Sequence, residues 1–363
     1  MARKERPVPK RVFVLPEWDL KNRTKASPLT HIMMERAAAS SGFEVIRVNR
    51  LSKIPRLLSL MYLPRDSVIL TIYPSVFLPI LRGGPRSAWR RLLRGVELRI
   101  WKRVLKGKRG IVYLYDNPVE QTLSARPDMV IDEGGSRRLE RGFLELYDTF
   151  LVFGEGHEKL LTKEYGLAGK RFVYYEFSEI LFEKNLEKKS SGGGYRIGYV
   201  SGAMPKGDWL SELADKLSST LNIYGRSDDL GRAGRSGIRY MGTLEHRELI
   251  GSLNKECEFG LVYYPQNMDA YISTAGTSKL STYMIAGIPV LYSSKYEHLA
   301  RMNKKYHIGV EFESLTDVPK ILKSLRSEDY SSMAKNCFRV GLLISRGQFT
   351  KDAITRSLVA RDS

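Results

Sequence analysis

Short apolar runs alternate with amphipathic stretches along the chain. Residues 11–15 and 67–73 are apolar runs of strand length, and residues 28–40 and 244–254 have the apolar spacing of helices. The order is strand, polar loop, helix and strand again. This rhythm predicts an α/β fold in which doubly wound parallel sheets are covered by helices.

Composition changes between residues 182 and 194, where a charged run passes into a Ser/Gly-rich run. A change of this kind indicates a linker between domains. We therefore expect a first domain over 1–181, a linker over 182–194, a second domain over 195–340 and a helical tail over 341–363. At 363 residues the chain is long enough for a core in each domain.

The formal net charge of +19 indicates an anionic partner, which could be nucleic acid, an anionic membrane surface or a phosphorylated substrate. Two cysteines provide no disulfide framework, and the five histidines have no ligand spacing, so no metal site is expected. The N-terminus lacks the apolar core of a signal peptide, and no run approaches the ~20 apolar residues of a membrane span. We expect a cytoplasmic protein that can be peripheral on the inner face of the membrane.

Residues 82–109 contain eleven arginines and lysines and a single acid, Glu97. Apolar residues recur among them at helical spacing, which predicts an apolar stripe with cationic flanks. Such a helix is typical of membrane interfaces. A packed helix with an arginine-rich outer face is the alternative. The apolar positions are Trp89, Leu92, Leu93, Val96, Ile100, Val104 and Leu105.

The most informative run is 277–291, which reads TSKLSTYMIAGIPVL. Thr277 or Ser278 can cap a helix that ends at Gly287, and Pro289 opens the next strand. The free N–H groups at the start of this helix, together with the charge of Lys279, suit a phosphate. An ordinary well-capped helix of a βαβ unit is the alternative.

This run resembles the nucleotide-sugar site of GT-B glycosyltransferases, and is most similar to the bacterial galactofuranosyltransferase-like and adhesin-glucosyltransferase family. The resemblance also rests on Tyr224-Gly225, Tyr240-Met241-Gly242 and Gly260-Leu261-Val262, in the same order as in that family. It implies two Rossmann-like domains that face each other across a cleft, with the C-terminal helix crossing back to the first domain.

The resemblance further implies transfer of a hexosyl group from a nucleotide diphosphate sugar, a UDP-sugar in the first instance, to a glycan, lipid-linked saccharide or glycoprotein. It implies retention of configuration. The nucleotide sugar is then a substrate, and no cofactor is expected. No Asp-x-Asp motif is present to hold a metal, so the reaction is expected to be metal-independent.

Two lysines are the expected catalytic cations. In the resembled enzymes one basic residue from each of two loops holds the donor diphosphate, and here these are Lys206 and Lys279. Asp116 matches the aspartate of a His-Asp pair in the first domain, although Tyr115 stands at the histidine position and an Asx turn before Pro118 is an equal reading. The expected donor-binding residues are Ser201, Gly202, Ala203, Tyr224, Arg226, Gly242, Tyr264, Thr277, Ser278 and Thr282. For Arg226, a surface position is the alternative.

One departure from the pattern concerns two glutamates that many retaining GT-B enzymes carry. Their positions correspond to Thr274 and Thr282 here, and neither side chain ionises. A different class of function is a non-enzymatic basic adaptor that binds RNA or an anionic membrane, but no RNA-binding signature is present. A dehydrogenase is disfavoured because no Gly-x-Gly-x-x-Gly follows the first strand.

Overall fold

The computed structural model describes most of the chain. Described are residues 10–16, 26–49, 53–74, 87–114, 119–120, 123, 132–182, 195–201, 209–217, 220–225, 237–264, 272 and 276–359, without the side chains of 26–28, 53 and 87–92. The chain forms two compact units. The first contains Met1–Trp18, Met34–Tyr175 and Thr350–Ser363, and the second contains Asp19–Met33 and Glu176–Phe349.

The first unit is built on a six-stranded parallel sheet in the order β2-β1-β3-β4-β5-β6. Its strands are rich in Val, Ile, Leu and Phe, and the four inner strands are buried along most of their length, as expected of strands covered on both faces. They are β1 (Arg11–Pro16), β2 (Glu44–Val48), β3 (Val68–Tyr73), β4 (Arg109–Leu114), β5 (Thr149–Val152) and β6 (Arg171–Tyr174).

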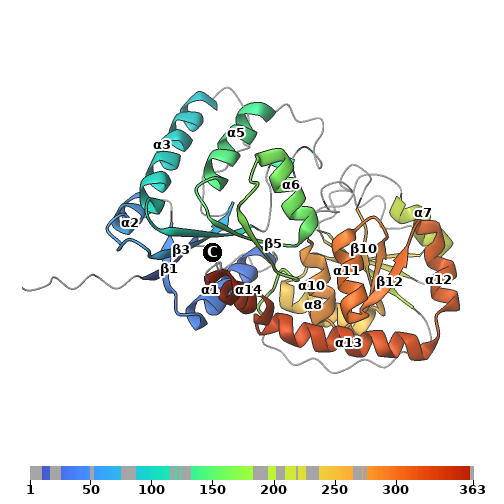
Figure 1. Cartoon of the computed structure of the whole chain (residues 1–363). Coiled ribbons are helices and arrows are strands. Elements are labelled where there is room, and N and C mark those ends of the chain that lie inside the picture. The colour runs from blue at the N-terminus through green and yellow to red at the C-terminus, as the bar shows by residue number, and fades with distance from the viewer. Residues whose placement is uncertain are drawn as a thin grey trace, which may run out of the picture. The chain divides into compact units, whose positions relative to one another are not determined.

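Helices cover both faces of this sheet. Figure 1 shows α3, α5 and α6 on one face, and α14 with the C-terminal part of α1 on the other. Right-handed crossovers produce this arrangement, because helices that carry the chain in opposite directions across a sheet lie on opposite faces. The helices are α1 (Ala26–Ser40), α2 (Lys53–Leu60), α3 (Ser87–Leu105), α5 (Glu133–Leu144), α6 (Glu155–Tyr165) and α14 (Gln348–Leu358).

The C-terminal helix α14 packs on the first unit, as predicted. Ala353 and Ile354 are fully buried in the core of that unit. Arg109 donates a hydrogen bond to the carbonyl oxygen of Leu358 (3.1 Å), and Arg171 donates to that of Arg356 (2.7 Å). These two strand arginines therefore hold the carboxyl end of α14.

The basic segment 82–109 is only partly a helix. Helix α3 ends at Leu105, and Arg109 already belongs to β4, while residues 82–86 lie outside the described residues. The residues of the predicted apolar stripe differ in their exposure to solvent. Val104 is fully buried, whereas Leu93 and Val96 are exposed, with 40% and 42% of their surface accessible.

The second unit contains a six-stranded parallel sheet in the order β12-β11-β10-β7-β8-β9. In chain order this is the Rossmann arrangement 3-2-1-4-5-6, which reverses direction between its first and fourth strands, β7 and β10. The strands are β7 (Ile197–Ser201), β8 (Leu221–Gly225), β9 (Ile238–Gly242), β10 (Phe259–Val262), β11 (Val290–Ser293) and β12 (Gly309–Phe312).

The first four described helices of this unit lie between its strands, and the others follow the last strand. They are α7 (Trp209–Lys216), α8 (His246–Glu256), α10 (Ser278–Ile285), α11 (Glu297–Tyr306), α12 (Val318–Ser324) and α13 (Ser327–Ser345), with a 3-10 turn at Leu315–Asp317. Two six-stranded parallel sheets in two Rossmann-like units confirm the predicted α/β architecture.

Tyr283 fixes helix α10 against the middle of the second sheet. Its hydroxyl accepts a hydrogen bond from the N–H of Val200 (3.1 Å) and lies within hydrogen-bond distance of the carbonyl oxygens of Gly198 (3.2 Å) and Leu261 (3.1 Å). The ring lies directly over Gly260, where a Cβ atom would be 2.3 Å from it. One side chain thus ties α10 to both strands at which the strand order reverses.

Candidate functional site

The point where the strand order reverses is where open α/β sheets bind ligands, at the carboxyl ends of the strands. In the second unit this point is formed by the ends of β7 at Ser201 and of β10 at Val262. Tyr263 and Tyr264 follow β10, and helix α10 begins nearby in the fold at Ser278. The site is therefore built from the ends of two strands and the start of one helix.

Lys279 is the cation at this point. Its Nζ lies 4.1 Å from the ring centre of Tyr264 and 4.4 Å from that of Tyr199, and it donates a hydrogen bond to the Tyr199 hydroxyl (3.3 Å). Two aromatic faces thus hold the ammonium group by cation–π attraction. Within the described part of the chain no carboxylate forms an ion pair with Lys279. Burial lowers the pKa of Lys279 to about 7.

Thr277 caps α10, as one of the two predicted candidates. Its Oγ1 accepts a hydrogen bond from the N–H of Lys279 (3.3 Å) and shares another with the hydroxyl of Tyr264 (2.7 Å). Burial raises the pKa of Tyr264 to about 12, so its hydroxyl stays protonated at neutral pH. The cap and the aromatic partner of Lys279 are therefore linked to each other.

Four further described candidates are Ser278, Thr282, Tyr224 and Ser201. Ser278 is the first residue of α10, and the Thr282 hydroxyl donates to its carbonyl oxygen (3.0 Å), so that hydroxyl serves the helix backbone. Tyr224 is buried with its hydroxyl against Ser252 (3.1 Å). Ser201 ends β7, the strand that carries Tyr199.

Two glycines shape the strand ends. Gly225 ends β8 with φ of +148°, and a Cβ there would lie 1.9 Å from the carbonyl oxygen of Ser201. Only glycine lets the two strand ends approach so closely. Gly242 ends β9 with φ of +79° and has open space where a side chain would project. The end of β8 is therefore packed closely against the backbone of Ser201. At the end of β9 the space beside Gly242 is open.

Several predicted site residues lie outside the described residues. They are Lys206, Asp116, Gly202, Ala203 and Arg226, together with Thr274. The convergence of Lys206 and Lys279 on one diphosphate, and the match of Asp116 to the family's aspartate, therefore stay predictions.

Tyr199 is a site residue that the sequence analysis did not single out. It also packs edge-on against Trp209 at 5.2 Å between ring centres, and Trp209 lies 4.7 Å from Tyr263. An aromatic residue two positions before the end of the first strand of a Rossmann unit could have drawn attention to it. Its meeting with Lys279 depends on β7 and β10 being neighbours, which the sequence does not state.

No group of three or more His, Cys, Asp or Glu side chains that could hold a metal ion occurs among the residues that the structure describes. None of the helices in the described ranges is long and apolar enough to cross a membrane.

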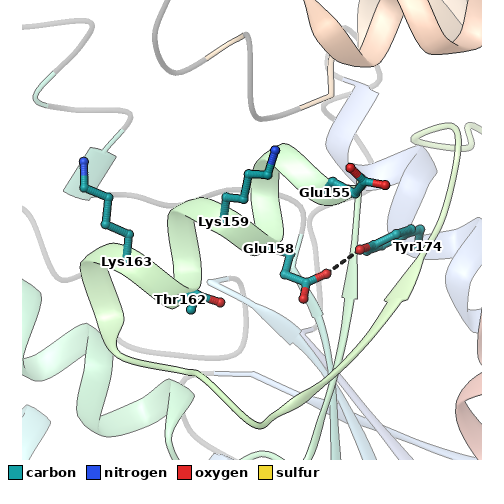
Figure 2. Close-up of a pocket in the computed structure, with 6 residues that line it drawn as sticks. All are labelled: Glu155, Glu158, Lys159, Thr162, Lys163 and Tyr174. Carbon is teal, nitrogen blue, oxygen red and sulfur yellow. Dashed lines mark hydrogen bonds between the residues drawn. The ribbon is translucent and has the colours of Figure 1, made fainter.

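A shallow hollow of about 510 Å³ lies in the first unit, along the outer side of α6. Figure 2 shows its lining, in which the Tyr174 hydroxyl donates a hydrogen bond to the carboxylate of Glu158. The lining residues are Glu155, Glu158, Lys159, Thr162, Lys163 and Tyr174. No predicted site residue is among them.

Comparison with known proteins identifies the second half of the chain. Residues 198–357 match the family described as "Glucosyltransferase 3-like, C-terminal domain". The chain carries a glucosyltransferase 3-like C-terminal domain. This domain contains Tyr199, Tyr264, Thr277 and Lys279, and so the whole described site lies within it.

Glucosyltransferase 3 of Streptococcus gordonii is 28% identical to this chain over 123 residues, which is 33% of this chain and 36% of that protein. The match therefore spans about a third of the relative. The predicted resemblance to the adhesin-glucosyltransferase family is confirmed by the glucosyltransferase 3-like domain.

Solved structures resemble the chain beyond this domain. Sucrose-phosphate synthase from Thermosynechococcus elongatus superposes with a TM-score of 0.62 and 12% identity, over 96% of this chain and 98% of that one. Anabaena HepE, solved in complex with UDP-glucose, gives a TM-score of 0.53 and 11% identity, over 96% and 99%. At such identities the likeness concerns the fold, and it confirms the GT-B class.

Proposed function

We propose that the chain is a metal-independent glycosyltransferase that moves a hexosyl group from a UDP-sugar to a hydroxyl group of a glycan, a lipid-linked saccharide or a glycoprotein, with retention of configuration. The glucosyltransferase 3-like domain supports the reaction class. UDP-glucose is the first donor to test, because the matched relative is named a glucosyltransferase and a structural neighbour was solved with UDP-glucose.

The observation that carries the proposal is the position of Lys279. It lies at the start of α10, beside the point where the strand order reverses, and among the described residues its charge is held by aromatic rings and by no acid. An ammonium group held in this way can bind an incoming diphosphate. The N–H groups of the first turn of α10 and the helix dipole favour the same negative charge.

In the proposed reaction the bond between the anomeric carbon and the donor diphosphate breaks, and the diphosphate leaves as UDP. The acceptor oxygen forms the new bond to the anomeric carbon on the same face, and its proton passes to the departing phosphate oxygen. Lys279 and the α10 N–H groups stabilise the negative charge that develops on the leaving group. Lys206 is proposed as the second cation at the diphosphate, and Asp116 as the group that orients the acceptor.

Isothermal titration of UDP-glucose into wild-type protein and Lys279→Met tests this assignment. Methionine keeps much of the aliphatic stem but removes the charge. A charge-assisted hydrogen bond contributes about 1.5–3 kcal/mol, so the affinity should fall roughly 10- to 100-fold. Lys304→Met, at an exposed lysine near the end of α11, is the matched control and should bind as wild type. Equal affinity of Lys279→Met and wild type would contradict the role of Lys279 at the diphosphate.

The adaptor alternative is separated by a thermal-shift panel. A formed nucleotide-sugar site should respond to UDP and UDP-glucose more than to adenine or guanine nucleotides. An RNA-binding adaptor should instead bind oligonucleotides with an affinity that falls steeply as salt rises. Stabilisation by RNA and by no nucleotide would favour the adaptor over the enzyme.

A further inference from the structure

Exposed apolar side chains gather on two neighbouring helices of the first unit. Of the six large hydrophobic side chains that are exposed among the described residues, five belong to α2, the turn after it, and α3, and the sixth is Val359 in the C-terminal tail. We call these five the α2–α3 surface. It consists of Ile54, Leu58, Tyr62, Leu93 and Val96.

The spacing of these residues places them in two stripes. Ile54, Leu58 and Tyr62 follow one another at intervals of four, and Tyr62 is 89% exposed in the turn after α2. Leu93 and Val96 are three residues apart on α3, so they lie on one side of that helix. The inner side of α2 is apolar as well, since Leu57 and Leu60 are buried in the core. An ordinary surface helix would carry polar residues on its outer side.

The two stripes belong to one face of the molecule. Helix α2 connects β2 to β3 and α3 connects β3 to β4, so both carry the chain in the same direction across the sheet. Right-handed crossovers then place both helices on the same face. The two helices contact each other, and Figure 1 shows α2 beside the carboxyl-terminal half of α3. The exposed apolar residues therefore lie on two adjacent helices of the same face, with Leu93 in the amino-terminal half of α3 and Val96 at its middle.

The same two helices also carry exposed cations. The exposed basic residues of the two helices and the turn after α3 are Arg56, Arg99, Lys102, Arg103 and Lys106. The acid of α3, Glu97, is buried. Within the described part of the chain, Lys102 and Lys106 form no ion pair with an acid. Exposed apolar and basic side chains therefore occur together on these two helices.

Three occupants can be compared on this chemistry. RNA would use the cations but gains nothing from exposed Ile, Leu and Val side chains. A second copy of the chain across a two-fold axis would bring the same basic residues together, which is unfavourable. An anionic lipid surface satisfies both features, because apolar side chains enter the headgroup region while Lys and Arg bind lipid phosphates.

We propose that the α2–α3 surface docks the protein on an anionic lipid bilayer, with its apolar side chains at the headgroup level and the basic residues of the same helices on the phosphates. The surface belongs to the first unit, and the proposal does not depend on the sugar-transfer reaction. Its failure would leave the Lys279 site untouched.

Co-sedimentation of the full-length protein with vesicles tests the proposal. The probes are vesicles of phosphatidylcholine alone and vesicles of phosphatidylcholine mixed with phosphatidylglycerol. Wild type should bind the mixed vesicles and remain in solution with phosphatidylcholine alone. Each basic residue near an anionic surface strengthens binding roughly fivefold. Lys102→Glu with Lys106→Glu should therefore weaken binding at least ~25-fold.

Two further variants separate a specific surface from bulk charge. Lys159→Glu with Lys163→Glu makes the same change at two exposed lysines, also four residues apart, on α6, and should bind as wild type. Leu93→Ser with Val96→Ser keeps every charge and should weaken vesicle binding several-fold, while Val359→Ser should not. Circular dichroism checks that each variant is folded.

The results that would overturn the proposal are distinct. Equal loss in the α3 and α6 lysine variants would mean that net charge alone binds the vesicles. Binding of RNA that depends on Lys102 and Lys106 but not on Leu93 and Val96, without vesicle binding, would assign the surface to nucleic acid. If the protein forms a dimer, if Leu93→Ser with Val96→Ser dissociates that dimer, and if no vesicle binding is seen, the surface would be a protein interface.

Discussion

Lys279 illustrates how a single residue can be prepared for an anionic ligand. Tyr199 and Tyr264 place aromatic faces against its ammonium group and shield it partly from water. The rings compensate only part of the lost hydration, so burial lowers the pKa of Lys279 to about 7. A diphosphate that binds here should therefore stabilise the charged ammonium form of Lys279 more than the neutral amine form.

This residue predicts a pH dependence of donor binding. A bound diphosphate favours the ammonium form, so the pKa of Lys279 is higher in the complex than in the free protein, where it is about 7. Above that pH binding takes up a proton, and the affinity should fall by up to about tenfold per pH unit as pH rises, until Lys279 deprotonates in the complex too. UDP-glucose is the suitable ligand, because its diphosphate does not titrate near neutral pH.

Calorimetric titration in buffers with different ionisation enthalpies measures the proton uptake directly. At pH values above the pKa of Lys279 in the unliganded protein, wild type should take up nearly one proton per UDP-glucose. At pH values well below this pKa it should take up none. Lys279→Met should show no such uptake at any pH. The same uptake in both proteins would assign the titration to another group.

Gly260 predicts a stability effect at the same site. A Cβ at this position would lie 2.3 Å from the Tyr283 ring, which cannot move without breaking its bonds to β7 and β10. Gly260→Ala should lower the free energy of unfolding of the second unit by about 1–3 kcal/mol or more, as overpacking does. Gly251→Ala on α8 is the control, since nothing lies within 4 Å of its added Cβ. It should be neutral or slightly stabilising in urea denaturation.

At the scale of the element, the helices whose ends depend on local chemistry were predicted well. Thr277 caps α10, and Gly287 follows its end with φ of +70°, as the residue types indicated. Each of these features needs only a few neighbouring residues. The inner side of α3 was not predicted, because it buries Arg94 and Glu97 beside Trp101. Whether a charged residue is buried depends on the partners that other elements of the fold provide. The periodicity of apolar residues carries no information about those partners.

Helix α14 gives a prediction at this scale. The arginines of β4 and β6 donate to the carbonyl oxygens at its carboxyl end, where the helix dipole also favours cations. Arg109→Ala with Arg171→Ala should release the last turn of α14. Hydrogen exchange at residues 354–359 should then become several-fold faster, with β10 unchanged. Lys351→Ala, at an exposed position of the same helix, is the control. Unaltered exchange in the double variant would show that burial of Ala353 and Ile354 alone holds the helix.

At the scale of the whole chain, the two sheets follow the same β-α rhythm but differ in strand order. The first sheet has β1 beside β3, and the second has β7 beside β10. The rhythm predicted doubly wound parallel sheets, and the resemblance added that they form two Rossmann-like domains. The rhythm itself does not say which strands are neighbours. That is why Lys279 was found from its helix cap and resemblance, whereas Tyr199, which reaches Lys279 only across the β7–β10 pair, was not.

The second unit also predicts how the protein responds to acid. His31 and His246 belong to this unit and are buried, and burial lowers the pKa of each to about 4. The unfolded chain binds a proton at each imidazole near pH 6.5, so between the two values the unfolded state holds more protons. The free energy of unfolding therefore falls as pH decreases through this window. The loss should reach about 3 kcal/mol for each histidine.

Hydrogen exchange of β10 and β11, corrected for the intrinsic rate at each pH, reports the opening of the second unit specifically. His246→Gln should remove about half of the loss of protection between neutral pH and pH about 4, because glutamine binds no proton. His307→Gln, which replaces an exposed imidazole, should keep the full loss. An unchanged pH dependence in His246→Gln would mean that the acid sensitivity of this unit has another origin, and the carboxylates that pair in it, such as Glu258 with Arg196, would be the next groups to test.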